Sequence, residues 1–215
     1  MSSLDGIARE MLAWFDDKNV AREESFKLCR EAIRSCSAAI RSVHRGQLDE
    51  AEKFTNEAKT KLESVRSLLK KHHDVRYAGF FDDAEQEFAE ARNVYSIVVK
   101  HEILTPEETG VELVNYLSGL GDVTGELRRH ILDLIRKGKS EEGEYYLDTM
   151  EEIFYLLMLF DYPDAITRGL RRKSDLARSM IERTRGDLTN AIEIGKLEVS
   201  LRSLEDKLKE SDLGV

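Results

Sequence analysis

Four acidic residues have the spacing of a metal site. Glu87 and Glu90 lie three residues apart in one segment with helical periodicity, and Asp122 and Glu126 lie four apart in a later one. Residues at these spacings share a face of an α-helix. Glu87 also interrupts an apolar seven-residue pattern, where an ionised carboxylate is costly unless it is paired, hydrogen-bonded or metal-bound. Carboxylates from two facing helices suit Mg²⁺, with Mn²⁺ as the alternative, and such an ion activates water against a phosphodiester.

Two other interpretations of these acids compete with a magnesium site. The chain holds 42 Asp and Glu among 215 residues, so acidic pairs at helical spacing also arise without function. A di-iron bundle is the rival carboxylate chemistry, but it requires Glu-x-x-His motifs, and the sequence contains none.

The segment that contains Asp122 is also rich in glycine. Gly119, Gly121 and Gly125 fall within seven residues of a predicted helix. Each glycine inside a helix costs about 1 kcal/mol relative to alanine. Their presence predicts close approach of another helix or of a ligand.

Basic residues form a stripe along the first predicted helix. Lys27, Arg30, Arg34 and Arg41 recur at helical spacing, in a chain whose net charge is −9. A solvated surface is the simpler interpretation of such a stripe, but a positive strip on an acidic protein would hold an anionic polymer in one place. Further candidates for contacts with such a polymer are Arg129, Arg171 and Arg172.

The composition predicts that the acidic and basic residues described above lie on helices. The chain is 41 % hydrophobic and 35 % charged with only 2 prolines, a mixture typical of long amphipathic helices. We expect a single all-α domain over residues 1–215. The start signal Thr105-Pro106, followed by Glu108, predicts that one helix begins there. The periodicity predicts six helices, at Leu4–Arg45, Gln47–His72, Tyr77–His101, Pro106–Lys137, Ser140–Phe160 and from after Asp164 to Lys209.

The remaining features concern location and assembly. The longest apolar run, Ile153 to Phe160, is too short to cross a membrane, and the start has no secretory pattern, so we expect a cytoplasmic protein with no membrane partner. Cys29 and Cys36 lie on the apolar face of the first helix, which predicts buried thiols. A heptad repeat near the C-terminus, from Ile194 to Leu208, predicts helix pairing or subunit pairing.

Taken in order, these motifs resemble the translin family, and most closely its catalytic branch, translin-associated factor X. The most specific match is Leu120–Leu127, which resembles the family's Asp-Leu-Thr-Gly-Glu-Leu signature. Gln86–Ala91 is similar to its acidic Glu-x-x-Glu helix, and Leu170–Asp175 is similar to a basic run in translin itself. Weaker matches lie at Asp16–Lys18, Lys27–Glu31 and His44-Arg45.

The resemblance implies a bundle of six to seven long helices that assembles into a closed hollow oligomer, commonly of eight subunits, and binds single- or double-stranded RNA inside. For the catalytic branch it implies a Mg²⁺-dependent endoribonuclease. Glu87, Glu90 and Asp122 match that branch's catalytic acids, and Glu126 matches the adjoining signature glutamate. This chain also carries translin-like basic residues, which a self-sufficient homo-oligomer of an archaeal type would need.

The sequence leaves two alternatives to an endoribonuclease. A non-catalytic RNA-binding protein of the same fold would use the basic stripe alone. A helical protein-interaction scaffold would neither cleave RNA nor bind it appreciably.

Overall fold

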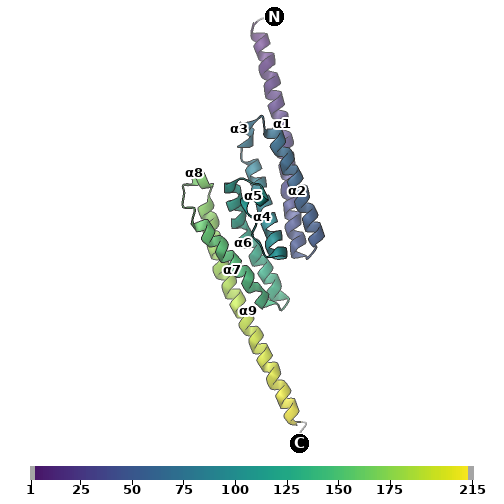
Figure 1. Ribbon diagram of the computed structural model, residues 1–215, viewed down its shortest axis with the longest axis vertical. Coiled ribbons are helices and arrows are strands. Elements are labelled where there is room, and N and C mark those ends of the chain that lie inside the picture. Colours follow the sequence, from purple (N-terminus) through teal and green to yellow (C-terminus); the bar gives the residue numbers. More distant parts are fainter. Residues whose placement is uncertain (1–2, 213–215) are drawn as a thin grey trace. The chain divides into compact units, whose positions relative to one another are not determined.

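The computed structural model describes residues 3–212 of the chain, and over that range it contains helices and no strand. Six long helices alternate with short ones (Figure 1), which confirms the predicted all-α fold. They are α1 (Ser3–His44), α2 (Leu48–Leu69), α3 (His73–Arg76), α4 (Phe80–Lys100), α5 (Pro106–Thr109), α6 (Leu113–Arg136), the 3₁₀ turn η1 (Ser140–Glu142), α7 (Gly143–Met158), α8 (Asp164–Thr167) and α9 (Leu170–Asp212).

The chain divides into two compact units, Met1–Leu120 and Gly121–Val215, which are called unit 1 and unit 2 below. The division falls inside α6, whose helical backbone continues through it. The predicted single domain over residues 1–215 stays a prediction.

In unit 1, α1 and α2 form a helical hairpin and α4 packs against both (Figure 1). The hairpin turns at Gly46, whose φ of +72° is the left-handed conformation that glycine adopts at least cost. Cys29 and Cys36 are buried in this core, as their positions on the apolar face predicted, together with Leu62, Phe81 and Ile97.

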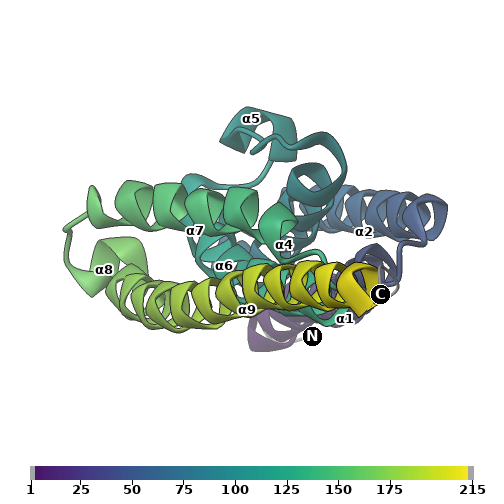
Figure 2. The ribbon, with the colours of Figure 1, turned by 90° about the horizontal axis from the view of Figure 1, so that it is seen from below.

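In unit 2, α7 and α9 lie side by side (Figure 2). A glycine at the start of α7 permits this packing, because a Cβ at Gly143 would lie 2.8 Å from Cδ1 of Leu188 and 3.3 Å from Cγ2 of Ile131. Met150 and Ile153 of α7 are fully or almost fully buried. The core of unit 2 therefore joins α6, α7 and the first half of α9.

Two of the predicted helices have wrong boundaries. The Thr105 capping box is present, with Pro106 at the first helical position, but it opens only the four-residue α5, which ends at Gly110 with a φ of +68°. A left-handed residue ends a helix, so α6 begins separately, and Leu113 at its start is 65 % exposed. The predicted second helix stops at Leu69, and α3 follows as a separate turn.

Two further observations concern α1 and the membrane. The first predicted helix forms one continuous element, because α1 runs from Ser3 to His44. Among the residues described, no helix combines the length and the apolar character needed to span a bilayer.

Candidate active site

The first pair of predicted acids lies on α4 in unit 1. Glu87 is half-buried, and Glu90 is buried, with 9 % of its surface exposed. Both carboxylates lie close enough to Cys36 of α1 to act on it: burial is the main cause of the raised pKa of the Cys36 thiol, and the charges of Glu87 and Glu90 raise it further. Two carboxyl groups one helical turn apart therefore lie near the buried thiol of Cys36.

The backbone of α6 touches α4 beside these acids. A Cβ at Gly119 would lie 2.7 Å from the carbonyl oxygen of Gln86, 2.8 Å from Cβ of Ala89 and 3.0 Å from the amide nitrogen of Glu90. Real Cβ atoms do not approach other atoms so closely, so only glycine allows this crossing. The prediction that the glycines mark close helix approach is confirmed at Gly119.

The second pair of predicted acids lies on α6 in unit 2. The ammonium of Lys173, from α9, donates a hydrogen bond of 2.5 Å to Oδ1 of Asp122. The lysine stem lies over Gly121, where a Cβ would come within 2.9 Å of Cβ of Lys173. Glu126 forms an i,i+3 ion pair of 3.7 Å with Arg129, one of the predicted RNA-binding residues. Both acids are half-buried.

The structure brings the acids together as two pairs, each within its own unit. Glu87 and Glu90 belong to unit 1, and Asp122 and Glu126 belong to unit 2. Among residues 3–212, no group of three or more His, Cys, Asp or Glu side chains is arranged to hold a metal ion. The four-acid metal site stays a prediction.

The basic stripe (Lys27, Arg30, Arg34 and Arg41) is exposed along its whole length. In the described part of the chain none of the four forms an ion pair with a carboxylate, and Arg30 lies 5.9 Å from the ring centre of Phe26. The other predicted RNA-binding residues are also exposed: Arg171 and Arg172 in the first turn of α9, and Arg129 on α6. Exposed cations with no acidic partner remain available to phosphate groups.

Sequence reasoning missed a buried ionic network one turn before Glu87. Arg76 donates to Asp82 at 3.1 Å and to Glu85 at 3.3 Å, and its ion pair with Glu112 measures 2.7 Å. Arg66 of α2 reaches Oε1 of Glu85 at 2.7 Å. Because Glu85 is only 1 % exposed, these contacts fix the start of α4 against α2 and α3.

One further residue joins the same network from α6. The side-chain amide of Asn115 donates to Asp82 at 3.0 Å and to Glu85 at 2.8 Å. The i,i+3 pair formed by Asp82 and Glu85 is the sequence signal that could have pointed to this network. It has the same spacing as Glu87 and Glu90, so spacing alone does not separate the structural pair from the candidate catalytic pair.

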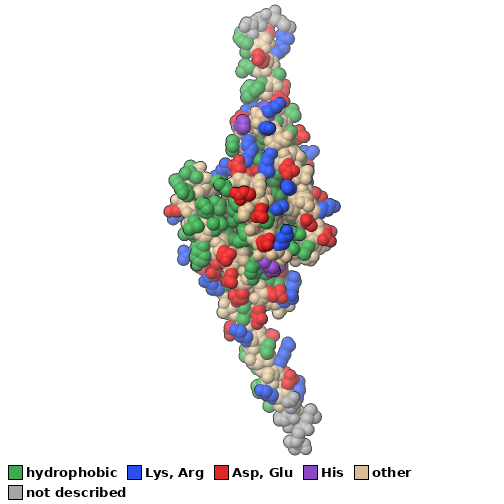
Figure 3. All heavy atoms as spheres, in the orientation of Figure 1, with side chains coloured by type: hydrophobic (Ala, Val, Ile, Leu, Met, Phe, Trp, Pro, Cys, Tyr) green, Lys and Arg blue, Asp and Glu red, His purple; other side chains and the backbone are tan. Residues whose placement is uncertain are grey.

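Apolar side chains are exposed at three places. Figure 3 shows a green patch over the end of α7 and over α8, and the residues exposed there are Tyr155, Met158, Leu159, Tyr162 and Ile166. The start of α1 exposes Leu4, Ile7, Met11, Trp14 and Phe15, and the end of α9 exposes Ile194, Leu197, Leu201, Leu204 and Leu208. Contiguous exposed apolar surface marks sites of protein association.

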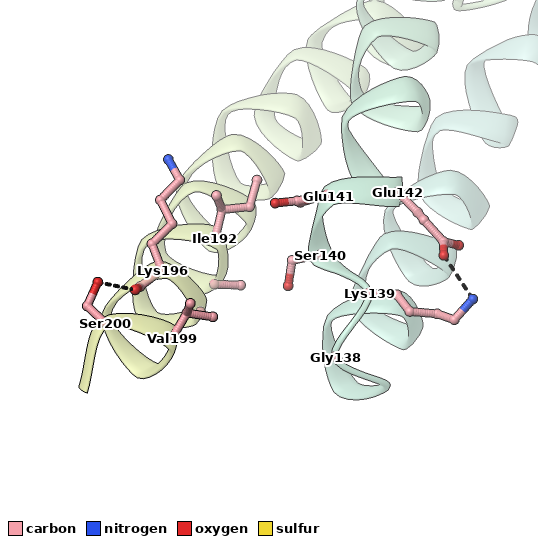
Figure 4. A pocket seen from close by; sticks show the side chains of 11 residues that line it. Gly138, Lys139, Ser140, Glu141, Glu142, Ile192, Lys196, Val199 and Ser200 are labelled. Atoms are coloured by element: carbon pink, nitrogen blue, oxygen red, sulfur yellow. Dashed lines mark hydrogen bonds and ion pairs between the residues drawn. The ribbon is translucent and has the colours of Figure 1, made fainter. Parts of the chain in front are cut away.

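A groove of about 720 Å³ lies between η1 and α9 in unit 2 (Figure 4). Lys139 and Glu142 pair on one side of it, and Ile192, Lys196 and Val199 line the other. None of the predicted site residues lines this groove.

The family model for translin matches residues 21–184. The chain belongs to the translin family. An uncharacterized protein of Methanocaldococcus jannaschii is 33 % identical over 200 residues, which cover 91 % of this chain and 87 % of that protein. The matched range includes every predicted acid and every predicted RNA-binding residue, whereas the exposed apolar ends of α1 and α9 extend outside it.

Three solved structures share this fold. The crystal structure of AfC3PO matches with a TM-score of 0.78 and 32 % identity, covering 88 % of this chain and 98 % of that one. The structure of an AfC3PO–duplex RNA complex matches with a TM-score of 0.71 and 31 % identity, with the same coverage. The crystal structure of apo-NeC3PO matches with a TM-score of 0.73 and 22 % identity, covering 89 % of this chain and 98 % of that one. This likeness shows the fold alone.

Proposed function

We propose that this translin-family chain is a metal-dependent endoribonuclease of the translin-associated factor X type. The observation that carries the proposal is the chemistry around Glu90, which is buried on α4 where the glycine backbone of α6 crosses. Two carboxyl groups one helical turn apart offer the oxygen ligands that a divalent cation such as Mg²⁺ prefers. The structural likeness to the AfC3PO–duplex RNA complex supports RNA as the substrate.

The donor set fits Mg²⁺, because Glu87, Glu90, Asp122 and Glu126 offer only carboxylate oxygens, the ligands that a hard cation prefers. When bound, Mg²⁺ supplies a Lewis acid for the phosphodiester and for the attacking water. The four acids would hold the cation and so position the scissile phosphate. Arg129 lies next to Glu126 and stabilises negative charge that develops on the phosphate.

RNA binding is proposed to involve the basic stripe together with Arg171 and Arg172. These side chains are exposed, and the stripe has no acidic partners in the described part of the chain. We further propose that the chain forms a homo-oligomer, with eight subunits as the specific stoichiometry. The three exposed apolar regions support self-association, since a second copy would cover them. Light scattering at several protein concentrations measures the mass directly, and a monomer at every concentration would contradict this assembly.

Cleavage of labelled RNA with and without Mg²⁺ tests the catalytic proposal. We expect Glu87→Gln and Asp122→Asn to lower the rate at least about 100-fold, because loss of a metal ligand removes several kcal/mol of transition-state stabilisation. Both variants should still bind RNA. Glu63→Gln, an exposed acid of α2, is the matched control and should cleave normally. Mn²⁺ should substitute for Mg²⁺. Unchanged cleavage in the Glu87 and Asp122 variants would reject the assigned site.

A non-catalytic RNA-binding protein is the second candidate. The observation that favours it is that Asp122 and Glu126 already have cationic partners, Lys173 and Arg129. This candidate predicts salt-sensitive RNA binding with no metal-dependent cleavage.

The salt dependence of binding tests the basic stripe in either case. For single-stranded RNA, a plot of log K against log salt has a negative slope, and this slope should become less steep by about 0.7 for each phosphate contact removed. We expect this less steep slope in Arg30→Gln and Arg34→Gln. Lys53→Gln and Lys59→Gln, exposed cations of α2, should leave the slope unchanged. Equal slopes in all four variants would show that RNA binds elsewhere.

A further inference from the structure

Four apolar residues form a stripe on the last part of α9, in unit 2. They are Ile194, Leu197, Leu201 and Leu204, called the C-terminal stripe below. Each of these side chains is more than half exposed, and every residue from 193 to 209 is exposed as well. In Figure 1 this part of α9 continues beyond α7 as a single helix. No helix of the described residues therefore covers the C-terminal stripe.

A helix without a packing partner gains little stability from its own sequence. Most helical stability in proteins comes from packing of an apolar face, and an isolated segment of this length is marginal in water. Gly195 weakens the segment further, by about 1 kcal/mol relative to alanine. Apolar surface contributes about 25 cal/mol for each Å² removed from water. A partner that covers the C-terminal stripe therefore stabilises this end of α9.

The spacing of the C-terminal stripe indicates that its partner is another helix. Its members lie alternately three and four residues apart, as positions a and d of a coiled-coil heptad do. A second copy of α9 presents the same spacing. In an antiparallel pair with Leu197 opposite Leu201 of the partner subunit, Ile194 lies opposite Leu204 of the partner subunit. Both stripes are then buried along their whole length.

The charges beside the C-terminal stripe favour this antiparallel register. Glu193 lies beside Lys207 of the partner subunit, and two-fold symmetry repeats the contact. Glu198 meets its own copy only once, so opposite-charge contacts are the more numerous. In a parallel pair, Glu193 would lie beside Glu198 of the partner subunit twice, and the carboxylates would repel. Lys196 of the same helix also pairs with Glu193, at 2.7 Å, but an exposed pair of this kind is weak.

We infer that the end of α9 is an interface that joins two copies of this chain in an antiparallel coiled coil. The C-terminal stripe lies beyond residue 184, where the match to the translin family model ends, so this contact is additional to the part of the chain that the family model describes. The inference rests on the proposed homo-oligomer, of which it identifies one interface. It uses none of the acids or cations assigned to the proposed nuclease.

Cross-linking of the full chain tests the inference. In the antiparallel pair Ser200 lies beside its own copy across the two-fold axis, so Ser200→Cys treated with a short bis-maleimide should give a covalent dimer. Cys29 and Cys36 are buried, which leaves the new thiol as the reactive one. Ser203→Cys, exposed on a side of α9 turned away from the stripe, is the matched control and should give no dimer. No dimer from Ser200→Cys, or equal dimer from both variants, would overturn the inference.

Exchange of charges tests the register. In the Ser200→Cys background, Glu193→Lys and Lys207→Glu should each raise the protein concentration needed for half-maximal cross-linking about tenfold, because two attractive contacts become repulsive. The double variant should return to the original value. Arg202→Glu reverses an exposed charge of α9 away from the stripe and should have no effect. Failure of the double variant to recover would contradict the antiparallel pairing.

Two results separate this interface from other modes of association. An oligomer in light scattering, with no covalent dimer from Ser200→Cys, would reject the interface and leave the proposed homo-oligomer intact, whereas a monomer at every concentration would reject both. A covalent dimer that forms only when Ser200→Cys is mixed with Glu10→Cys would identify the exposed start of α1 as the partner. That result would also overturn the inference.

Discussion

The ammonium of Lys173 donates a hydrogen bond to Asp122, and the stem of the lysine lies over Gly121 on the same helix as the acid. The glycine is what permits this contact, since any larger residue would push the lysine away from α6. A cation contributed by α9 therefore occupies one oxygen of an acid that is proposed to bind Mg²⁺.

Lys173→Gln should lower the Mg²⁺ concentration needed for half-maximal RNA cleavage. The variant removes a competing cation from Asp122, and partly exposed ion pairs contribute up to about 1 kcal/mol, so the decrease should reach about fivefold. Titration of cleavage rate against Mg²⁺ gives this value. Lys139→Gln, which removes an exposed ion pair with Glu142, should leave it unchanged. A higher Mg²⁺ requirement in Lys173→Gln would mean that the lysine supports the site rather than competes with the ion.

Gly119→Ala should destabilise the protein. The new methyl group would lie 2.7 Å from the carbonyl oxygen of Gln86, so α6 and α4 must separate, at a cost of about 1–3 kcal/mol. Urea unfolding measures this loss. Gly186→Ala is the matched control, because its Cβ would meet no atom within 4 Å and alanine favours the helix by up to about 1 kcal/mol. Equal stability of Gly119→Ala and the wild type would show that the crossing is looser than the structure indicates.

Arg76→Met should be among the most destabilising substitutions in unit 1. It leaves Asp82 and Glu85, which are both buried, without one of their cationic partners, and breaking a buried ion pair costs about 3–5 kcal/mol. Arg178→Met, which removes only an exposed i,i+4 pair with Glu182, should cost less than about 0.5 kcal/mol. Chemical unfolding measures the loss of stability in each variant. Similar losses in the two variants would show that the buried network contributes little to the free energy of unfolding.

Stability should fall at alkaline pH because of the two thiols. Burial raises the pKa of Cys29 to about 12 and also raises that of Cys36, whereas thiols of an unfolded chain titrate near about pH 8.5. Above that pH the unfolded state loses these protons while the folded state retains them. The folded state then binds more protons, so the free energy of unfolding decreases as pH rises from about 9 toward 12. Below about pH 8 the thiols contribute no slope.

Urea unfolding at a series of alkaline pH values, in the wild type and in Cys29→Ala and Cys36→Ala, isolates this effect. Each variant should show a shallower decline than the wild type. The tyrosines with raised pKa, Tyr95, Tyr116 and Tyr146, are present in every protein compared, so their contribution cancels. Identical slopes would show that the thiols ionise as readily in the folded chain as in the unfolded one.

Helical periodicity predicted much of this fold because it records which face of each helix is buried. It placed Cys29 and Cys36 in the core correctly. The cost of glycine predicted that another helix or a ligand approaches α6, and at Gly119 the structure shows a helix. Periodicity did not separate α5 from α6, because the capping box at Thr105 predicts where a helix begins but not where it ends. The left-handed Gly110 is what stops α5.

The sequence predicted the candidate site less completely than it predicted the fold. Spacing identified Glu87 and Glu90, but Asp82 and Glu85 have the same spacing and serve as partners of Arg66 and Arg76. Such partners come from other helices, and no local pattern records them. For the same reason Lys173 was assigned only to a basic group, although its contact is with Asp122, 51 positions earlier in the chain.

The burial of both native cysteines has a practical consequence for experiments on this protein. The chain contains only these two thiols, and neither reaches the surface. A cysteine introduced at an exposed position such as Lys53 would therefore be the single site open to maleimide dyes under native conditions. Fluorescent versions of the protein could thus be prepared without first replacing any residue of its interior.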